Sequence, residues 1–487
     1  MLNPNRDSAV LVLASAFFAG CLICWSIVCL GPKLTLAVAI IPLALPFVVT
    51  YAAMTERGIL DPTALFPAFF GAYNGIPLIR FLSDDFVQRL SYPVKFEPNT
   101  YFRAGLLSAL AAIFIATTWA VWRRPAHQKK RELDRTGWFN VGSALYIFGM
   151  LLYQLQYLQV GGYWAALAIE RTRRFEVMAE TTSLPYFAFV LVGLVMTAAA
   201  SNSRRRRVAT ILMTLLWSVL VVVQGDRRLL LQTVVAVLGA SLFVAGESIK
   251  IGMKHVVLVV VAYAALAVVG QLREQIPRLV SDTGSQHTIV DSDRKDSLLD
   301  SVTPGNAELG APFLSVLYNS EYVTDYRIGR SYLDTIPCIF PRIIYHSKPP
   351  SPAAELANEV NRGQIFGFSP AGWGYSPVAE AFLNFGTLGV CLVSSLWMVA
   401  FIALSHLRNY RWGLVTAAVL TPETINANRI DFRTVYLEAF SCIAVVLIAI
   451  FIVKSLHHIS PRRLSHGMMA ERTYHHSSQE PRHLEYR

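Results

Sequence analysis

The sequence predicts an all-α integral membrane protein with about twelve transmembrane helices. Of its 487 residues, 54% are hydrophobic and only 15% are charged, whereas soluble proteins carry about 25% charged residues. Apolar runs long enough to cross a bilayer, roughly 20 residues each, recur through most of the chain. Lysine and arginine concentrate in alternate segments between these runs, which is typical of membrane helices of fixed orientation. Lipid is therefore the solvent for most of the chain, and a single membrane domain is expected.

The transmembrane helices are expected where the apolar runs lie. The first run is long and is followed at once by another, so it is interpreted as a signal anchor rather than a cleaved signal peptide. The third run is the weakest of the set. In chain order, the predicted spans are 8–30, 34–54, 63–80, 101–122, 138–160, 184–201, 208–224, 229–245, 255–272, 377–404, 411–427 and 435–454.

These spans divide the chain into four segments. Residues 1–272 hold the first nine helices, and residues 376–454 hold the last three. Residues 273–375, between the ninth and tenth spans, form a large periplasmic loop in which the stretch "APFLSVLYNSEYV" is expected to be helical. Residues 455–487 are polar and are expected to form a disordered cytoplasmic tail.

The charge pattern predicts the orientation of the helices. Twelve spans place both termini on one side, together with the basic segments "WRRPAHQKKRELDR", "SNSRRRR" and "HLRNYR". The segments on that side carry a net charge of +13, and because the whole chain carries +11, the opposite side carries −2. The basic side is expected to be cytoplasmic. The excess of basic residues is thus explained by topology, and a nucleic-acid partner is not needed.

Arginines on the expected outer side are unusual, because positive charge is disfavoured in short translocated loops. Arg173 and Arg174 lie in "ERTRRFE", and Arg227 and Arg228 lie in the turn between two spans. These side chains either snorkel or pair with neighbours such as Glu170, or they form an anion site. Arginine binds phosphate oxygens through two parallel hydrogen bonds and keeps its charge. At this face of a membrane, the anion would be a lipid phosphate or pyrophosphate.

The stretch "SPVAEAFLNFGTLG" at 376–389 places a carboxylate and an amide inside an apolar run. Ser376 is predicted to cap a helix whose first turn contains Pro377. Glu380, Asn384 and Thr387 then share one helix face, and Gly386 and Gly389 allow another helix to approach closely. Glu380 is either a first-turn acid that favours the helix dipole or part of a wet outer vestibule, since intramembrane carboxylates normally face water.

The eleventh predicted span is only half apolar. Its stretch "WGLVTAAVL" is followed by "TPETINANRIDFR" before the last span begins. If the chain stays helical, the polar half needs water, and if it breaks, the irregular backbone must line a protein cavity. In either case Asn426, Asn428, Arg429 and Arg433 are expected to approach the outer vestibule.

The sequence contains no pattern that demands a metal or a cofactor. Cys338 is the single cysteine in the predicted outer loop, so no loop disulfide is expected within one chain. No cluster of histidine and cysteine and no DxD-type motif demands a metal. We therefore expect a protein without a metal site and without a cofactor.

Three segments carry a resemblance to a known family. They are "GDRRLLLQ" at 225–232, "IPCIFPRIIYHSKP" at 336–349, and "SPVAEAFLNFGTLG" at 376–389. Together with the large late outer loop, they resemble the oligosaccharide repeat-unit polymerases, the O-antigen polymerase family of bacterial inner membranes. The resemblance concerns pattern and layout over most of the membrane body.

The resemblance implies a glycosyltransferase of GT-C-like fold in the inner membrane. It implies polymerisation, at the periplasmic face, of oligosaccharide repeat units carried on undecaprenyl pyrophosphate into an O-antigen, a capsule or an exopolysaccharide. Membrane lipid, a chain-length regulator and a flippase are the other partners implied. The family's outer-loop arginines correspond here to Arg173 or Arg174, Arg227 or Arg228, and Arg342. Lys348, at the end of the second segment, is also expected to bind substrate.

The expected chemistry assigns roles to these residues. Arginines, with Arg227 and Arg228 foremost, stabilise the negative charge that develops on the pyrophosphate leaving group. Glu380 is expected to orient or deprotonate the acceptor hydroxyl, and Asp226, His346 and Glu438 are the alternatives. Asn384 and Arg429 are expected to bind substrate beside it.

Three other functions were weighed. An O-antigen ligase would use the same donor but transfer the glycan to lipid A–core. A flippase or other polysaccharide transporter would place charged residues deep in several spans and show repeat symmetry, whereas here the polar residues lie at the outer end. A scaffold protein would not require Glu380 and the outer arginines together.

Overall fold

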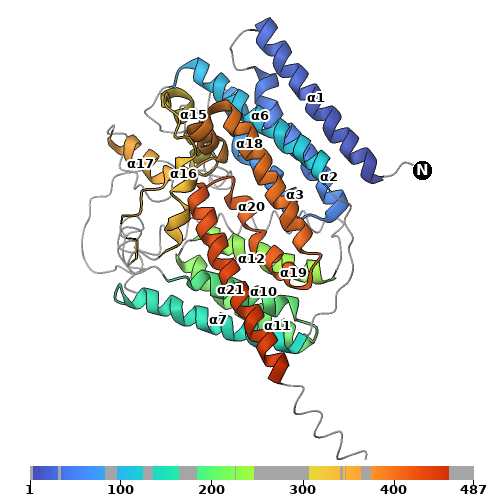
Figure 1. Cartoon of the computed structure of the whole chain (residues 1–487), viewed down its shortest axis with the longest axis vertical. Coiled ribbons are helices and arrows are strands. Elements are labelled where there is room, and N and C mark those ends of the chain that lie inside the picture. Colours follow the sequence, from blue (N-terminus) through green and yellow to red (C-terminus); the bar gives the residue numbers. More distant parts are fainter. Residues whose placement is uncertain are drawn as a thin grey trace, which may run out of the picture.

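A computed structural model describes residues 4–30, 35–82, 96–123, 135–163, 184–224, 226–245, 306–340, 344–345, 347–362 and 374–459. Within these ranges all regular secondary structure is helical (Figure 1). The membrane-type helices are α1 (Pro4–Leu30), α2 (Leu36–Arg57), α3 (Pro62–Phe70) with the π-helix η1 (Gly71–Gly75) and α4 (Ile76–Leu82), α6 (Pro98–Trp122), α7 (Arg135–Leu158), α10 (Tyr186–Ala199), α11 (Arg204–Gln224), α12 (Arg227–Ala245), α18 (Pro377–Leu407), α19 (Arg411–Leu420) and α21 (Phe432–Ile459). Shorter helices are α15 (Asn306–Tyr322), α16 (Arg330–Leu333), η2 (Ile336–Ile339), α17 (Pro352–Arg362) and α20 (Glu423–Asn426).

Nine helices in the described ranges are long and apolar enough to cross a membrane, and α10 is a shorter apolar helix. The nine coincide with nine of the twelve predicted spans, including the weak third span, which is formed by α3, η1 and α4 together. The predicted span at 255–272 lies outside the described residues. The chain is therefore a multi-pass helical membrane protein.

The predicted span at 411–427 is not one continuous helix, so of the two possibilities considered for it the broken form is observed. Helix α19 ends at Leu420, and after a turn containing Pro422 the short helix α20 follows. Proline has no N–H to continue the helical hydrogen bonds, and it disfavours the helical backbone of the residue before it. The polar side chains of this broken segment are nonetheless buried, among them Thr424 and Asn428. Irregular backbone at membrane depth is tolerated when protein encloses it.

The predicted outer loop at 273–375 is partly helical. Its described portion contains α15, which covers the stretch predicted to be helical, followed by α16, η2 and α17. Figure 1 shows α15, α16 and α17 gathered at the left side of the molecule, beside the first turns of α18 and α21. The predicted tail begins within α21, which continues to Ile459, and residues 460–487 lie outside the described part.

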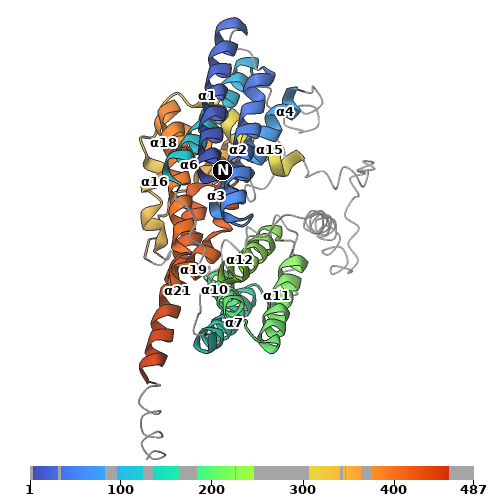
Figure 2. The same cartoon turned by 90° about the vertical axis from the view of Figure 1, so that its right-hand side faces the viewer.

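The helices pack as two groups. One apolar core joins α1, α2, α3, α6, α15 and α18. Two further cores join α7, α10, α11 and α12 with α19 and α21. Figure 2 shows α7, α10, α11 and α12 gathered below α1, α2 and α4. Helix α19 contacts both groups, since it packs against α18 as well as α12 and α21.

Glycine allows the closest helix contact in the second group, between α7 and α10. A Cβ on Gly193 would lie 2.6 Å from the backbone nitrogen of Tyr146, and one on Gly142 would lie 2.9 Å from the carbonyl oxygen of Gly193. Small residues that let backbones approach are the usual basis of helix association in lipid.

A buried ion network joins the ends of α2 and α18. Asp61 caps α3 by accepting from the Thr63 N–H at 2.9 Å, and its other oxygen accepts from Ser405 at 2.6 Å. Arg408 reaches that same oxygen at 2.8 Å, and Arg57 donates to the Ser405 hydroxyl at 2.6 Å. Because every member has a partner, the desolvation cost of burying these charges is offset.

Candidate active site

The start of α18 positions the first candidate side chains. Ser376 caps the helix as predicted, since its hydroxyl accepts from the Val378 N–H at 3.2 Å and Pro377 follows it. Glu380 lies one turn further on and is 1% exposed. The cap sets the direction of the helix and thereby places Glu380 among protein groups.

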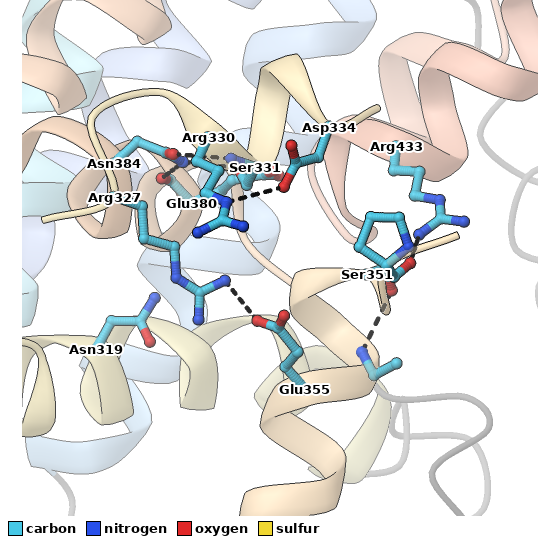
Figure 3. Close-up of polar contacts among 12 residues, drawn as sticks. Asn319, Arg327, Arg330, Ser331, Asp334, Ser351, Glu355, Glu380, Asn384 and Arg433 are labelled. Carbon is cyan, nitrogen blue, oxygen red and sulfur yellow. Dashed lines mark hydrogen bonds and ion pairs between the residues drawn. The ribbon is translucent and has the colours of Figure 1, made fainter. Parts of the chain in front are cut away.

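Glu380 joins three helices. One carboxylate oxygen accepts from the Ser331 hydroxyl on α16 at 2.9 Å (Figure 3). The other accepts from the backbone N–H of Phe432 at the start of α21 at 2.8 Å. Asn384 completes the network, because its amide donates to the Ser331 Oγ at 2.7 Å and its oxygen accepts from the Ser331 N–H at 3.2 Å. The expectation that Glu380 faces a wet vestibule is therefore wrong: protein groups enclose the carboxylate.

A break in α18 makes this network possible. Gly386 has φ +64° and ψ −153°, which only glycine adopts readily. The break frees the carbonyls of Leu383 and Asn384 from helical bonding, and they accept instead from the N–H groups of Arg327 at 3.0 Å and Ile328 at 2.9 Å. The polar turn before α16 is thus held against α18 by backbone as well as side-chain hydrogen bonds.

The same break corrects two predictions. Thr387 is exposed and does not share the buried face of Glu380 and Asn384, because the helical register changes at Gly386. Gly386 also does not admit a neighbouring helix, since its nearest neighbour is the ring of Tyr326, which lies in the turn before α16.

A buried tyrosine lies beside this first network. The hydroxyl of Tyr332 has no hydrogen-bond partner among the described residues. Burial, with a further contribution from the negative charge of Glu380, raises the pKa of Tyr332 well above its ordinary value. Tyr332 therefore keeps its proton.

A second polar cluster lies where α12, α20 and α21 meet. Arg228 and Glu438 form an ion pair in which Nη1 and Oε1 are 2.6 Å apart. Gln232, one turn along α12 from Arg228, donates to Glu438 at 2.9 Å and to Glu423 at 3.2 Å. Asn426 also donates to Glu423 at 3.2 Å. One guanidinium and two amides therefore surround two carboxylates.

Asp226 has a structural role at the start of α12. Its carboxylate accepts from the backbone N–H groups of Arg228 at 3.0 Å and Leu229 at 3.2 Å, which otherwise have no helical partner. Of the alternatives for a catalytic base, Glu438 contacts an arginine, whereas Asp226 caps a helix. His346 lies outside the described residues.

Helix α21 carries both clusters. Phe432, which donates to Glu380, and Glu438 are separated by six residues, or about 9 Å along the helix axis. The first network and the second cluster therefore lie within two turns of each other.

The other predicted site residues are less closely grouped. Lys348 donates to the carbonyl of Cys338 at 2.7 Å, and the carbonyl of Arg429 accepts from the Tyr375 N–H at 2.9 Å. The Arg433 guanidinium donates to the carbonyl of Pro349. Arg173, Arg174, Arg342 and the side chain of Arg227 lie outside the described residues.

Sequence reasoning missed Glu423, Gln232 and Ser331 as site residues. A signal existed for Glu423, because it is the only acid within the predicted span at 411–427, and an intramembrane acid is a functional candidate. Gln232 follows Arg228 by four residues in an otherwise apolar run, which places both on one helix face. No local signal distinguished Ser331.

Fold and site together define a multi-pass helical membrane protein with buried and half-buried acidic, amide and arginine side chains near one end of its helices. A family model described as O-antigen polysaccharide polymerase Wzy matches residues 126–458, more than half of the chain. The chain belongs to this family, as the resemblance predicted, and both polar clusters lie within the matched range. No curated protein and no solved structure is significantly similar to the chain.

Membership of this family identifies the protein as a polymerase of O-antigen repeat units that acts on lipid-linked oligosaccharides. The ligase and transporter alternatives are not favoured.

Proposed function

We propose that the chain joins O-antigen repeat units carried on undecaprenyl pyrophosphate, at the periplasmic face of the bacterial inner membrane, with both termini in the cytoplasm. The observation that carries this proposal is the family match over residues 126–458. It agrees with a helical membrane body in which Glu380 contacts the outer-loop helix α16. A flippase that supplies the repeat units and a chain-length regulator are the protein partners that such a reaction requires.

The reaction exchanges one bond at the anomeric carbon. The acceptor sugar hydroxyl attacks the anomeric carbon of the donor, the bond from that carbon to the pyrophosphate oxygen breaks, and undecaprenyl pyrophosphate leaves with the bonding electrons. The acceptor proton passes to a base. No metal enters this scheme, because guanidinium groups stabilise the developing negative charge on the leaving group.

In this proposal Arg228 and Glu438 are the reacting pair. Their side chains are 27% and 19% exposed, whereas Glu380 is 1% exposed. A base must reach the acceptor hydroxyl, and the ion pair meets this requirement better than Glu380. Arg228 would bind the pyrophosphate and Glu438 would receive the proton, while Glu380 and Asn384 would be positioning residues.

The remaining predicted side chains complete the proposed substrate site. Arg227, Arg173 or Arg174, and Arg342 would add further guanidinium groups around the pyrophosphate, as in the family pattern. Lys348 and Arg429 would contact the donor or acceptor glycan beside them.

The proposal is tested with purified protein in lipid vesicles and an undecaprenyl-pyrophosphate-linked repeat unit. A ladder of products that differ by one repeat unit is expected on a gel. Adding lipid A–core as a second acceptor separates the alternatives, because a ligase would transfer glycan to lipid A–core and make no ladder without it. A ladder that persists when Arg228 is replaced by alanine would place the pyrophosphate site elsewhere.

A further inference from the structure

A cavity of about 330 Å³ lies beside the first network. It is enclosed by α15, the segment that follows it, α17 and the start of α18. Its volume is at the lower end of the range of small-molecule sites, about 300–1,000 Å³. Tyr375, directly before the Ser376 cap, and Leu383, in the second turn of α18, form part of its wall. The cavity is therefore adjacent to Glu380 but does not include it.

The charges of this cavity disfavour an anionic ligand. Among the described residues of its lining, the charged side chains are Arg327, Asp325 and Glu355, which together carry a net charge of −1. A pyrophosphate would meet two carboxylates and one guanidinium that already pairs with Glu355 at 2.5 Å. An acyl chain is also disfavoured, because burying these charges against hydrocarbon is costly. An uncharged ligand rich in hydroxyl groups fits this lining.

The same side chains have the chemistry that recognises sugars. Arg327 and Glu355 are 36% and 29% exposed, so their outer edges can donate to and accept from adjacent hydroxyls. Figure 3 shows Arg327 reaching across to Glu355 on α17, with Asn319 nearby on α15. Tyr318 and Tyr322 lie 4.7 Å apart between ring centroids and present apolar faces with polar tips.

The polar wall of the cavity is held rigid. Asn319 donates to the Tyr375 hydroxyl at 2.9 Å and to the carbonyl of Ala379 on α18 at 3.0 Å. These bonds join α15 to the helix that carries Glu380. A ligand in the cavity is thereby placed at a fixed position relative to the first network.

We propose that this cavity binds uncharged sugar residues of the repeat unit, away from the pyrophosphate that Arg228 binds. The inference rests on the proposed function, because it assigns part of the same substrate to a second site. It separates the protein into an arginine site for the lipid pyrophosphate and a tyrosine- and carboxylate-lined site for the glycan.

The test measures binding of a lipid-free oligosaccharide to the full-length protein in detergent by titration calorimetry. The probe is the repeat-unit oligosaccharide released from the O-antigen of the source bacterium. Glu355→Gln removes the charged acceptor but keeps its size, and Tyr322→Ala removes a half-exposed ring. Each is expected to weaken binding about tenfold, as loss of one charge-assisted hydrogen bond or one ring contact does. Asp334→Asn is the matched control, because Asp334 pairs with Arg330 outside the cavity.

Three outcomes are informative. Wild-type affinity in both cavity variants, with unchanged melting temperatures, overturns the cavity proposal even if the ladder assay succeeds. Competition by inorganic pyrophosphate at the cavity overturns it as well. A third outcome separates the two proposals. If both variants weaken oligosaccharide binding but the wild-type protein makes no ladder with lipid-linked substrate, the glycan site is supported and the proposed polymerisation is refuted.

Discussion

Two amide side chains hold the acidic residues of the second cluster in place. Gln232 and Asn426 each donate to both Glu423 and Glu438, and Arg228 forms an ion pair with Glu438. The two carboxylates therefore share three donor side chains, one guanidinium and two amides. At the residue scale, this arrangement fixes Glu438 in one orientation while leaving part of the ion pair exposed.

Replacing Arg228 by lysine is expected to lower the rate of ladder formation by roughly 100-fold. Lysine keeps the charge but has no planar fork for the pyrophosphate oxygens, and one lost charge-stabilising donor costs on the order of 100- to 1000-fold. The measurement is the initial rate at saturating donor. Arg204→Lys, at the exposed start of α11, is the control and should retain the wild-type rate.

Glu438→Gln is expected to lower the rate by a similar factor and to be non-additive with Arg228→Lys. Residues that act as a unit give double variants little worse than the single ones. The four rates of the double-mutant cycle measure the coupling between the two side chains. Full additivity would mean that Glu438 and Arg228 act independently and that the base lies elsewhere.

Glu380→Gln separates the two roles considered for Glu380. A glutamine cannot accept from both Ser331 and Phe432, so the variant should be destabilised by about 1–3 kcal/mol. We expect a lower melting temperature, a reduced rate and an unchanged pH–rate profile. A variant that melts like the wild type but loses both the rate and the acidic limb of the profile would instead identify Glu380 as the base.

At the element scale, breaks in helices create the site. The break of α18 at Gly386 frees two carbonyls that bind the turn before α16, and the break between α19 and α20 brings Glu423 and Asn426 toward α12. In a continuous helix the backbone N–H and C=O groups bond to one another, so only side chains are left to contact neighbouring elements. The polar backbone and side chains near Glu380 and Glu423 are therefore consequences of interrupted helices.

Gly386→Ala is expected to destabilise the protein and abolish ladder formation. A Cβ at this position would lie 2.8 Å from the ring of Tyr326, and the backbone conformation itself is strained for alanine. Melting temperature in detergent and ladder formation are the two measurements. Gly20→Ala in α1 is the control: its Cβ meets nothing within 4 Å, and alanine favours a helix by about 1 kcal/mol. Equal stability of the two variants would contradict the role of the break.

At the scale of the whole molecule, the two ends of the helical body differ in chemistry. Near one end, α15, α16 and α17 lie beside Glu380 and the cavity. At the other, α2 ends beside α6 and α18, where Arg123 pairs with Glu56 and Arg408 pairs with Asp61. This second end adjoins the segments rich in lysine and arginine, which agrees with the proposed cytoplasmic side.

The proposed orientation is checked with reporter fusions. Fusions after Arg135, Arg207 and Lys454 should report the cytoplasm, and fusions within 281–300 should report the periplasm, because basic segments remain on the cytoplasmic side. Alkaline phosphatase and green fluorescent protein give opposite signals and serve as controls for each other. A periplasmic signal after Arg207 would place Arg228 on the wrong side for the proposed donor.

The sequence by itself determined the class of protein and its family. Long apolar runs, the alternation of basic segments and the Ser376 cap are local properties, because lipid solvation and helix capping depend on a few consecutive residues. Arg228, Glu380 and Asn384 could be selected for the same reason, as polar groups in apolar runs are visible locally. The resemblance in "GDRRLLLQ" and "SPVAEAFLNFGTLG" led to the family that the match over residues 126–458 shows.

Only the tertiary structure decided which of these residues act together. Ser331 and Phe432 are 49 and 52 residues from Glu380, and Glu438 is 206 residues from Gln232, so no local pattern reports their contacts. The loss of a continuous eleventh helix and the register change at Gly386 also depend on distant partners for the freed backbone groups. Burial of Glu380 and exposure of the Arg228–Glu438 pair follow from how α12, α16, α18 and α21 pack, which is a property of the assembled molecule.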